Sequence, residues 1–256
     1  MKYAILSDVH GNLEALTAVL EDMENRLIKE IVFLGDAIGY GADPEQCFNL
    51  IDKKSNLMIL GNHDFSVATG SGIDELNEEA AFAIKWTTWV IKEQSRKKIK
   101  NLPLDNIDNG DNSDNSLHFV HGSPYKPIEF NYILTDKDAE RGFSESKGNI
   151  IFVGHTHIPK IFVEVEYSRT FTGEVRRIKE EVTTELQIES KYRYIINVGS
   201  VGQPRDGDSR AAYGIYDSDE GTYFLIRVPY NVEGAAEKIK KAGLPEGLSN
   251  RLKSGR

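Results

Sequence analysis

Six short apolar runs that end abruptly in polar side chains constrain the fold of this chain more than any other feature. Runs of this length that are rich in Ile, Val and Leu are typical of buried strands. In an open α/β sheet, ligands bind just beyond the carboxyl ends of the strands. We therefore expect the polar clusters to meet at one edge of a sheet and to form a metal site. The clusters are Ser7-Asp8-Val9-His10, Gly35-Asp36, Gly61-Asn62-His63-Asp64, His121-Gly122, Gly154-His155-Thr156-His157 and Asn197-Val198-Gly199-Ser200.

The order of the expected elements predicts an α/β fold. Strands are expected over 3–7, 31–34, 57–60, 117–120, 150–153, 194–196, 212–217 and 222–228. Helices are expected over 12–25, 43–53, 136–147 and 232–242, with a further long helix that opens at Asp74 and stays within the region before Pro103. Strands alternate with helices in the first half and dominate the second half. This order predicts a four-layer α/β/β/α sandwich of two mixed β-sheets flanked by helices.

We predict a single domain over 1–243, with a charged β-hairpin inserted at about 163–193 and a loosely held C-terminal tail over 244–256. The hairpin alternates Val and Ile with Glu, Lys and Arg and turns at Thr172-Gly173. It could cap the active site or form a subunit interface, and a homo-oligomer is compatible with the sequence. The Asp- and Asn-rich segment 106–116 lacks the twelfth-position glutamate of a calcium loop and is expected to be a turn between strands.

Composition limits the partners of the chain. Among 256 residues the net charge is −9 and the isoelectric point is about 5.3, which argues against binding a long nucleic acid. The single cysteine, Cys47, cannot form an intramolecular disulfide and is expected to be buried in a helix. No apolar run approaches membrane-spanning length, so we expect no membrane partner and a cytoplasmic location.

Five of the polar clusters resemble, in the same order, the signature blocks of the calcineurin-like metallophosphoesterases. These blocks are Asp8-x-His10, Gly35-Asp36, Gly61-Asn62-His63-Asp64, His121-Gly122 and Gly154-His155-x-His157. The segment from Asn197 to Asp208, followed by Arg210 to Tyr213, resembles the bacterial and archaeal branch with simple phosphodiesterase or phosphatase activity. A single block of this kind is common in proteins, but five in order, each at the end of an expected strand, form a specific pattern.

The resemblance implies a site that holds two divalent metal ions. Asp36 would bridge the ions, and a hydroxide between them would be the nucleophile. Carboxylate, imidazole and amide ligands suit Mn²⁺, which we favour, and also Fe, Ni, Co or Zn. The first ion would be completed by Asp8, His10 and His157, and the second by Asn62, His121 and His155.

The resemblance also implies catalytic and substrate-binding residues. His63 would contact the phosphate and protonate the leaving oxygen as a general acid, and Asn62 would also contact the substrate. We expect Asp64 to hold the His63 ring in orientation. Arg205 could bind a substrate phosphate or brace its own loop through Asp206 or Asp208, and both alternatives stay open.

Some chemically suggestive residues are expected to be structural. His118 lies three positions before His121 on the same strand, so alternation places it on the opposite face of the sheet. The aromatic cluster of Phe82, Trp86 and Trp89 has helical spacing and is expected in the core. Tyr40 could line the mouth of the site, although we favour packing.

We predict an enzyme, a two-metal phosphoester hydrolase that acts on a small phosphorylated substrate, with nucleotides among the candidates. Within that class, phosphodiesterase and phosphomonoesterase activities both fit the ligands. A phosphoprotein phosphatase and a dinucleoside-polyphosphate phosphatase are alternatives. A non-catalytic scaffold of the same fold is a further alternative, disfavoured because His63 and all the ligand types are present.

Overall fold

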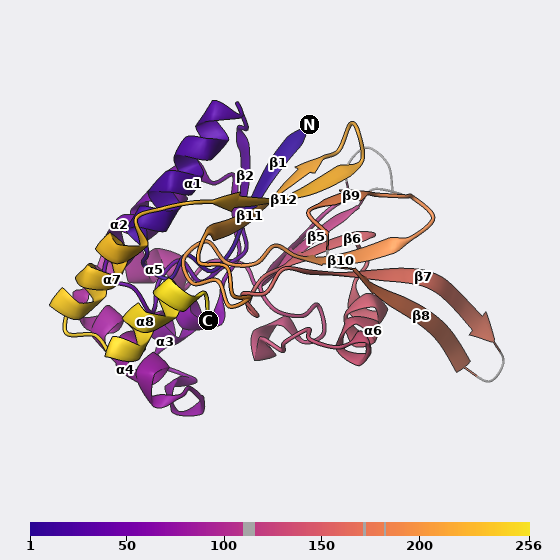
Figure 1. Ribbon diagram of the computed structural model, residues 1–256. Helices are drawn as coiled ribbons and strands as arrows, with labels where there is room; N and C mark the ends of the chain where they lie inside the picture. The colour runs from indigo at the N-terminus through magenta and orange to yellow at the C-terminus, as the bar shows by residue number, and fades with distance from the viewer. Residues whose placement is uncertain (110–115, 171–172, 182) are drawn as a thin grey trace.

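Two six-stranded mixed sheets form the centre of the protein, among the residues that the computed structural model describes, namely 1–109, 116–170, 173–181 and 183–256 (Figure 1). In strand order, the first sheet contains β3 (Leu57–Met58), β2 (Glu30–Phe33), β1 (Lys2–Leu6), β11 (Ala211–Asp217), β12 (Thr222–Val228) and β9 (Glu185–Gln187). The second contains β4 (Asp105–Asp108), β5 (Leu117–Val120), β6 (Ile150–Val153), β10 (Arg193–Asn197), β7 (Lys160–Thr170) and β8 (Gly173–Glu181).

Parallel pairing brings the polar clusters to one edge of each sheet. In the first sheet β1, β2 and β3 are parallel, and in the second β5, β6 and β10 are parallel. The clusters that follow these strands therefore all leave from carboxyl ends, which is the edge where ligands of α/β sheets collect. The other pairings in both sheets are antiparallel.

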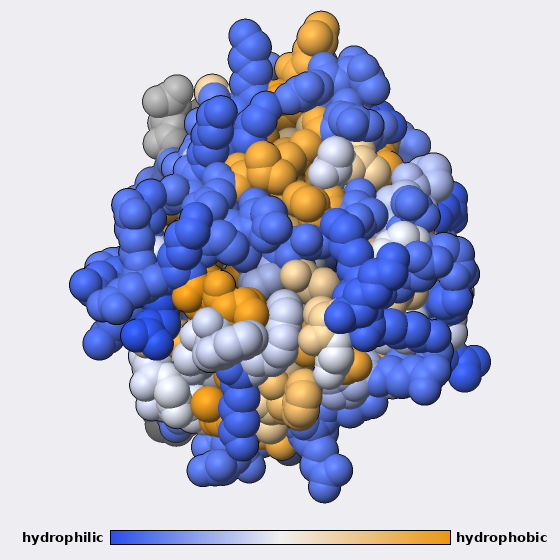
Figure 2. Space-filling model, turned by 90° about the vertical axis from the view of Figure 1, so that its left-hand side faces the viewer, coloured by the Kyte–Doolittle hydropathy of each residue, from blue (hydrophilic) through white to orange (hydrophobic). Residues whose placement is uncertain are grey.

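Helices cover the outer faces of the two sheets. They are α1 (Leu13–Asn25), α2 (Pro44–Lys54), α3 (Asn62–Thr69), α4 (Glu78–Val90), α5 (Glu93–Ile99), α6 (Asp136–Glu145), α7 (Val232–Lys241) and α8 (Glu246–Ser254), with short 3₁₀ turns at Ile73–Glu75 and Pro127–Glu129. Figure 1 shows α6 against the second sheet, with most other helices on the side of the first. The helical face is mainly hydrophilic, with small separate apolar patches (Figure 2).

The core follows these layers. One apolar cluster, including Ile5, Phe119 and Phe152, fills the space between the two sheets. A second lies between the first sheet and its helices, and a third lies between α6 and the second sheet. The predicted α/β/β/α sandwich is therefore confirmed. Cys47 is buried in α2, as expected.

The C-terminal segment is not a loosely held tail. Residues 246–254 form α8, which packs on α7 and buries Leu248 and Leu252. These two side chains are one helical turn apart and face α4 and α7, where burial stabilises each by roughly 1.5–3 kcal/mol. The expectation of a loose tail over 244–256 was wrong, because the amphipathic pattern of this short segment is a weak indication of a helix by itself.

The charged insertion also differs from its prediction. A long hairpin is present, but it consists of β7 and β8 and begins at Lys160. Residues 185–187 form β9, which pairs with β12 of the other sheet, so the second part of segment 163–193 crosses between sheets. The expected turn residue Thr172, and most of the expected turn within 106–116, lie outside the described residues.

The helical region after residue 70 begins later than predicted. The side chain of Asn77 caps the backbone N–H of Ala80, so α4 begins at Glu78 and not at Asp74. The buried side of α4 carries Ala80, Ala83, Ile84 and Thr87, with no aromatic side chain among them. Phe82 and Trp89 point to solvent, with 49% and 83% of their surfaces exposed, and only Trp86 is partly buried. The expected aromatic core cluster is therefore wrong.

Candidate metal centre

Backbone strain marks the loops that carry the candidate ligands. Left-handed φ values are rare outside glycine, cost about 1–3 kcal/mol each and concentrate at functional sites. Here they occur at five of the seven ligands expected from the sequence. The residues are Asp8 (55°), His10 (50°), Asp36 (60°), His155 (65°) and His157 (61°). The fold therefore sustains an unfavourable backbone where these side chains have to converge.

Asp8, His10 and His157 form the first group of candidate ligands, with ligand atoms within 4.8 Å of one another. The Nε2 atoms of His10 and His157 are 3.1 Å apart. Asp8 Oδ1 lies 3.3 Å from His157 Nε2, is buried and has no hydrogen-bond partner. All three side chains are almost fully buried.

Asp36, His121 and His155 form a second group by the same distance limit. Asn62 joins it, because its Oδ1 lies 3.2 Å from His121 Nε2. Asp36 Oδ2 is 3.4 Å from His121 Nε2 and 3.7 Å from His10 Nε2, so this oxygen lies between the two groups. A carboxylate in this position can bridge two ions.

The other carboxylate oxygen of Asp36 is a hydrogen-bond acceptor for the first turn of α3. Asp36 Oδ1 accepts a hydrogen bond from the backbone N–H of His63 at 2.9 Å. A side chain at Gly61 would overlap the Asp36 carboxylate, so glycine is required for this close approach. The Gly-Asn-His-Asp sequence thus docks a helix N-terminus, with its partial positive charge, on the central carboxylate.

The hydrogen bonds of the histidines show that the site suits cations. Their Nδ1 atoms lie near backbone carbonyls: His10 at 3.2 Å from Ile38, His121 at 2.9 Å from Leu34 and His157 at 2.6 Å from Gln203. An Nδ1–H that donates to a carbonyl leaves the lone pair on Nε2. The Nε2 lone pairs then face one another and the carboxylates. Such a cluster of acceptors is stable only with a cation or added protons among them, which fits divalent ions.

In the metal-free protein, the pKa values show which of these groups holds a proton in place of a metal ion. Burial acts to lower the pKa of His121, but the Asp36 carboxylate outweighs it and raises that pKa to about 9. Burial lowers the pKa of His155 to about 3 and of His157 to about 4. Burial opposes ionisation of Asp36, yet the neighbouring histidines hold its pKa well below the usual range.

Asp64 does not orient His63, contrary to expectation. Its carboxylate accepts backbone N–H groups from Asp36 at 2.8 Å, Ala37 at 3.3 Å and Ile38 at 3.3 Å. His63 Nδ1 is buried without a hydrogen-bond partner. Burial and the Asp36 carboxylate raise the pKa of Asp64 to about 7, against the effect of the backbone donors. Asp64 therefore braces the loop that carries Asp36.

His63 lies against the two ligand groups without the hydrogen bonds that fix a ligand ring. Its ring packs at 4.5 Å from Tyr40 and 4.8 Å from His10, measured between centroids. Burial lowers the pKa of His63 well below its usual value, so the imidazole is neutral at neutral pH. A neutral imidazole can donate a hydrogen bond to a phosphate oxygen, and an anionic ligand nearby would increase its basicity.

A cavity of about 170 Å³ opens over the ligands and is lined by Asp36, Asn62, His63, His155 and His157. Arg205 lines it too, and its guanidinium donates to Gln203 at 2.8 Å and lies over the ring of Tyr40. The alternative in which Arg205 pairs with its own loop carboxylates is wrong. Arg227 pairs with Asp206, and Arg210 with Asp208.

Two tyrosines shape this cavity, and sequence reasoning missed one of them, Tyr132. Tyr132 stacks on His155 with ring centroids 4.0 Å apart and planes 7° apart, while half of its surface remains exposed. Tyr40 also lines the cavity while packing on His10 and His63, so both roles considered for it hold. Tyr132 belongs to none of the strand-end motifs, because a long loop separates it from the end of β5.

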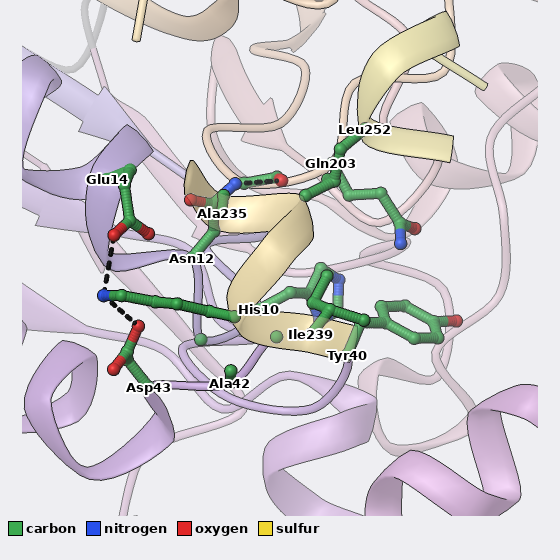
Figure 3. Close-up of a pocket in the computed structure, with 14 residues that line it drawn as sticks. His10, Asn12, Glu14, Tyr40, Ala42, Asp43, Gln203, Ala235, Ile239 and Leu252 are labelled. Atoms are coloured by element: carbon green, nitrogen blue, oxygen red, sulfur yellow. Dashed lines mark hydrogen bonds and ion pairs between the residues drawn. The ribbon is translucent and has the colours of Figure 1, made fainter. Parts of the chain in front are cut away.

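A second cavity of about 10 Å³, room for about one water, lies behind His10 (Figure 3). Ile239 of α7 and Leu252 of α8 form part of its wall. At its edge, Lys238 bridges Glu14 at 2.6 Å and Asp43 at 2.8 Å. The two C-terminal helices therefore pack directly on the back of the loops that carry the ligands.

The remaining polar residues noted in the sequence are structural. His118 bonds Ser146 at 2.8 Å and Asp105 at 3.0 Å, away from the ligand groups, as expected. Asn197 is not among the grouped ligands; its amide donates to the Gly154 carbonyl at 2.6 Å and braces the loop before His155.

Within the described part of the chain, no helix has the length and apolar composition to cross a membrane.

A sandwich of two sheets with an Asp and His cluster at the strand ends fits a metal-dependent phosphoesterase, and comparison with known proteins supports that class. The model of the calcineurin-like phosphoesterase superfamily domain matches residues 1–221. An uncharacterized protein of Methanocaldococcus jannaschii is 40% identical over 253 residues, which are 99% of this chain and 98% of that protein.

Solved structures give the same result. A metallophosphoesterase from Sphaerobacter thermophilus is 36% identical, covers 100% of both chains and has a TM-score of 0.83. A hypothetical protein from Pyrococcus horikoshii shares the fold, with 22% identity, coverage of 100% and 98%, and a TM-score of 0.74. This chain therefore belongs to the calcineurin-like phosphoesterase superfamily and is a metal-dependent phosphoesterase, as the sequence pattern predicts.

Proposed function

We propose that this protein binds two divalent metal ions and hydrolyses a phosphoester of a small phosphorylated substrate. The observation that carries the proposal is the position of the Asp36 carboxylate, which faces a ligand group on either side at the base of an open cavity. A bridging carboxylate beneath open space suits a centre that must hold two ions and still admit a phosphate.

The ligand assignment follows the two groups. Asp8, His10 and His157 would hold one ion, and Asn62, His121 and His155 the other, with Asp36 shared. Bound ions would supply an activated water and neutralise charge on the phosphoryl group. We favour Mn²⁺, although the same ligands suit Fe, Ni, Co or Zn.

The protein side chains would orient the phosphate and manage protons. His63 lies beside the candidate ligands, and both His63 and the candidate ligand Asn62 line the cavity. The His63 ring and the Asn62 NH₂ group could each donate a hydrogen bond to a phosphate oxygen. His63 would protonate the leaving oxygen once the anionic phosphate raises its low pKa. Arg205 contacts Gln203 and Tyr40, and it would pair with another oxygen of the same phosphate.

The test is hydrolysis of bis-p-nitrophenyl phosphate beside p-nitrophenyl phosphate by metal-stripped protein re-supplied with Mn²⁺, Ni²⁺ or Zn²⁺. Asp36→Asn removes the bridging charge, and Asp219→Asn is the matched control because Asp219 is exposed and pairs with the N-terminus. We expect turnover that requires metal, is lost in Asp36→Asn and persists in Asp219→Asn.

The ratio of the two activities assigns the substrate class. Faster cleavage of the diester supports a phosphodiesterase, and faster cleavage of the monoester supports a phosphatase. Absence of turnover with every metal, while two ions per chain are bound, would refute the proposed hydrolytic function.

A further inference from the structure

The C-terminal helix contributes a cation to the candidate active site. Arg251, on α8, lines the same cavity of about 170 Å³ as Asp36, His63 and Arg205. The family model ends at residue 221, before α7 and α8 begin. Arg251 is thus a cavity residue outside the part of the chain that the family model describes.

Arg251 has capacity for a further anion. Its Nη2 lies 3.3 Å from Glu79 Oε2, and both side chains are about one third exposed. A guanidinium has five N–H donors, and a carboxylate in a bidentate pair engages two of them. The remaining donors can therefore serve a ligand without breaking the pair.

The charges of the cavity favour an extended anion. Arg205 and Arg251 line it together with one acidic residue, Glu75, besides the candidate ligand Asp36. The metal ions and Arg205 would serve the scissile phosphate. A cavity of about 170 Å³ is many times the ~10–15 Å³ that a single enclosed water needs on the same measure, so a further polar group fits beyond that phosphate.

We propose that Arg251 forms a subsite for a second phosphate group, so that the preferred substrates carry two phosphates on one small molecule. Arginine recognises phosphate through paired, charge-assisted hydrogen bonds, and lysine cannot reproduce that geometry. The proposal rests on the proposed function for the place of the first phosphate. It makes Arg251 a specificity-determining residue and leaves the bond-breaking chemistry to the metal centre.

The test is calorimetric titration of the Mn²⁺-loaded protein with propyl phosphate and with 1,3-propanediol bisphosphate, which differ by one phosphate. Each is used as its phosphonate analogue, in which CH₂ replaces the ester oxygen, so that the protein cannot hydrolyse it during the titration. We expect the wild-type protein to bind the bisphosphate about 10-fold more tightly or better, because hydrogen bonds to charged groups are worth that much. Arg251→Gln should abolish the preference and leave the affinity for propyl phosphate unchanged.

Two further variants separate recognition from folding. Lys253→Gln removes the same charge from the same helix, where Lys253 pairs with Glu233 and does not line the cavity, and it should keep the preference. Glu79→Gln should strengthen bisphosphate binding, because it removes the competing carboxylate. If the ion pair between Arg251 and Glu79 were purely structural, Arg251→Gln and Glu79→Gln would both bind the bisphosphate more weakly. Both variants would also have a lower melting temperature.

The outcomes distinguish this proposal from the proposed function. Equal binding of the two compounds by wild-type protein, or a preference that survives in Arg251→Gln, would overturn the subsite even if p-nitrophenyl phosphate is hydrolysed. A preference that depends on Arg251 supports the subsite even if no hydrolysis occurs, and only the proposed function would then fail.

Discussion

The substitution Asp64→Asn separates two accounts of a residue next to the candidate general acid. If Asp64 braces the loop that carries Asp36, the variant should bind metal more weakly yet turn over normally once saturated. If Asp64 instead acts on His63, the variant should bind metal normally and turn over slowly. The hydrogen bonds of Asp64 favour the first account.

The size of the effect follows from those bonds. The two carboxylate oxygens of Asp64 accept three backbone N–H groups, at 2.8, 3.3 and 3.3 Å. An asparagine has one acceptor oxygen, so at least one buried N–H loses its partner, at a cost of about 1–3 kcal/mol. Because this loop also carries the Ile38 carbonyl that orients His10, the cost should weaken metal binding. A cost of about 2 kcal/mol corresponds to roughly 30-fold.

The assay is Mn²⁺ titration by calorimetry together with kcat at saturating Mn²⁺, both at pH 8. At that pH Asp64 is ionised, since burial raises its pKa only to about 7. Asp219→Asn, an exposed carboxylate distant from the ligand groups, should match wild type. Unchanged metal affinity with kcat reduced tenfold or more would refute the bracing account.

Three further predictions concern the site and its support. His63→Ala should keep both metal ions and lose about 10²–10⁴-fold in kcat, which metal analysis beside turnover would check; retention of full activity on a poor leaving group would contradict the general-acid role. Because the pKa of His121 is raised to about 9 in the folded protein by Asp36, against the effect of burial, its stabilisation is present below about pH 6.5 and is lost as the pH rises to 9. Thermal unfolding of metal-free protein should therefore shift downward over that range, and Mn²⁺ binding below pH 9 should release protons to the buffer. Leu248→Ala should destabilise the protein by about 2–5 kcal/mol in chemical denaturation, because Leu248 is fully buried, whereas Leu134→Ala, at an exposed position, should change stability little.

The sequence predicts that the candidate ligands converge, because each follows an apolar run, and the structure brings their side chains together. A strand end is a local signal, and parallel pairing then brings separate strand ends together. The backbone strain at Asp8, His10 and His155 has no such local signal, since no glycine or turn motif requires it. The hydrogen bonds of Asp64 join distant segments, as does the contact of Arg205 with Tyr40, and spacing within their own motifs does not reveal these contacts.

The C-terminal helix shows a different limit. Leu244, Leu248 and Leu252 recur every four residues, which is a helical signal. The segment is short and polar otherwise, so this signal carries little weight until the packing against α4 and α7 is known. The position of Arg251 at the cavity depends on that packing.

Anomalous diffraction from a crystal grown with Mn²⁺ tests the central claim most directly. The account predicts two peaks about 3.5–4 Å apart, with a carboxylate oxygen of Asp36 between them and His10 and His121 bound to different ions. A single peak, or two peaks that do not share Asp36, would contradict the two-metal centre on which the proposed function depends.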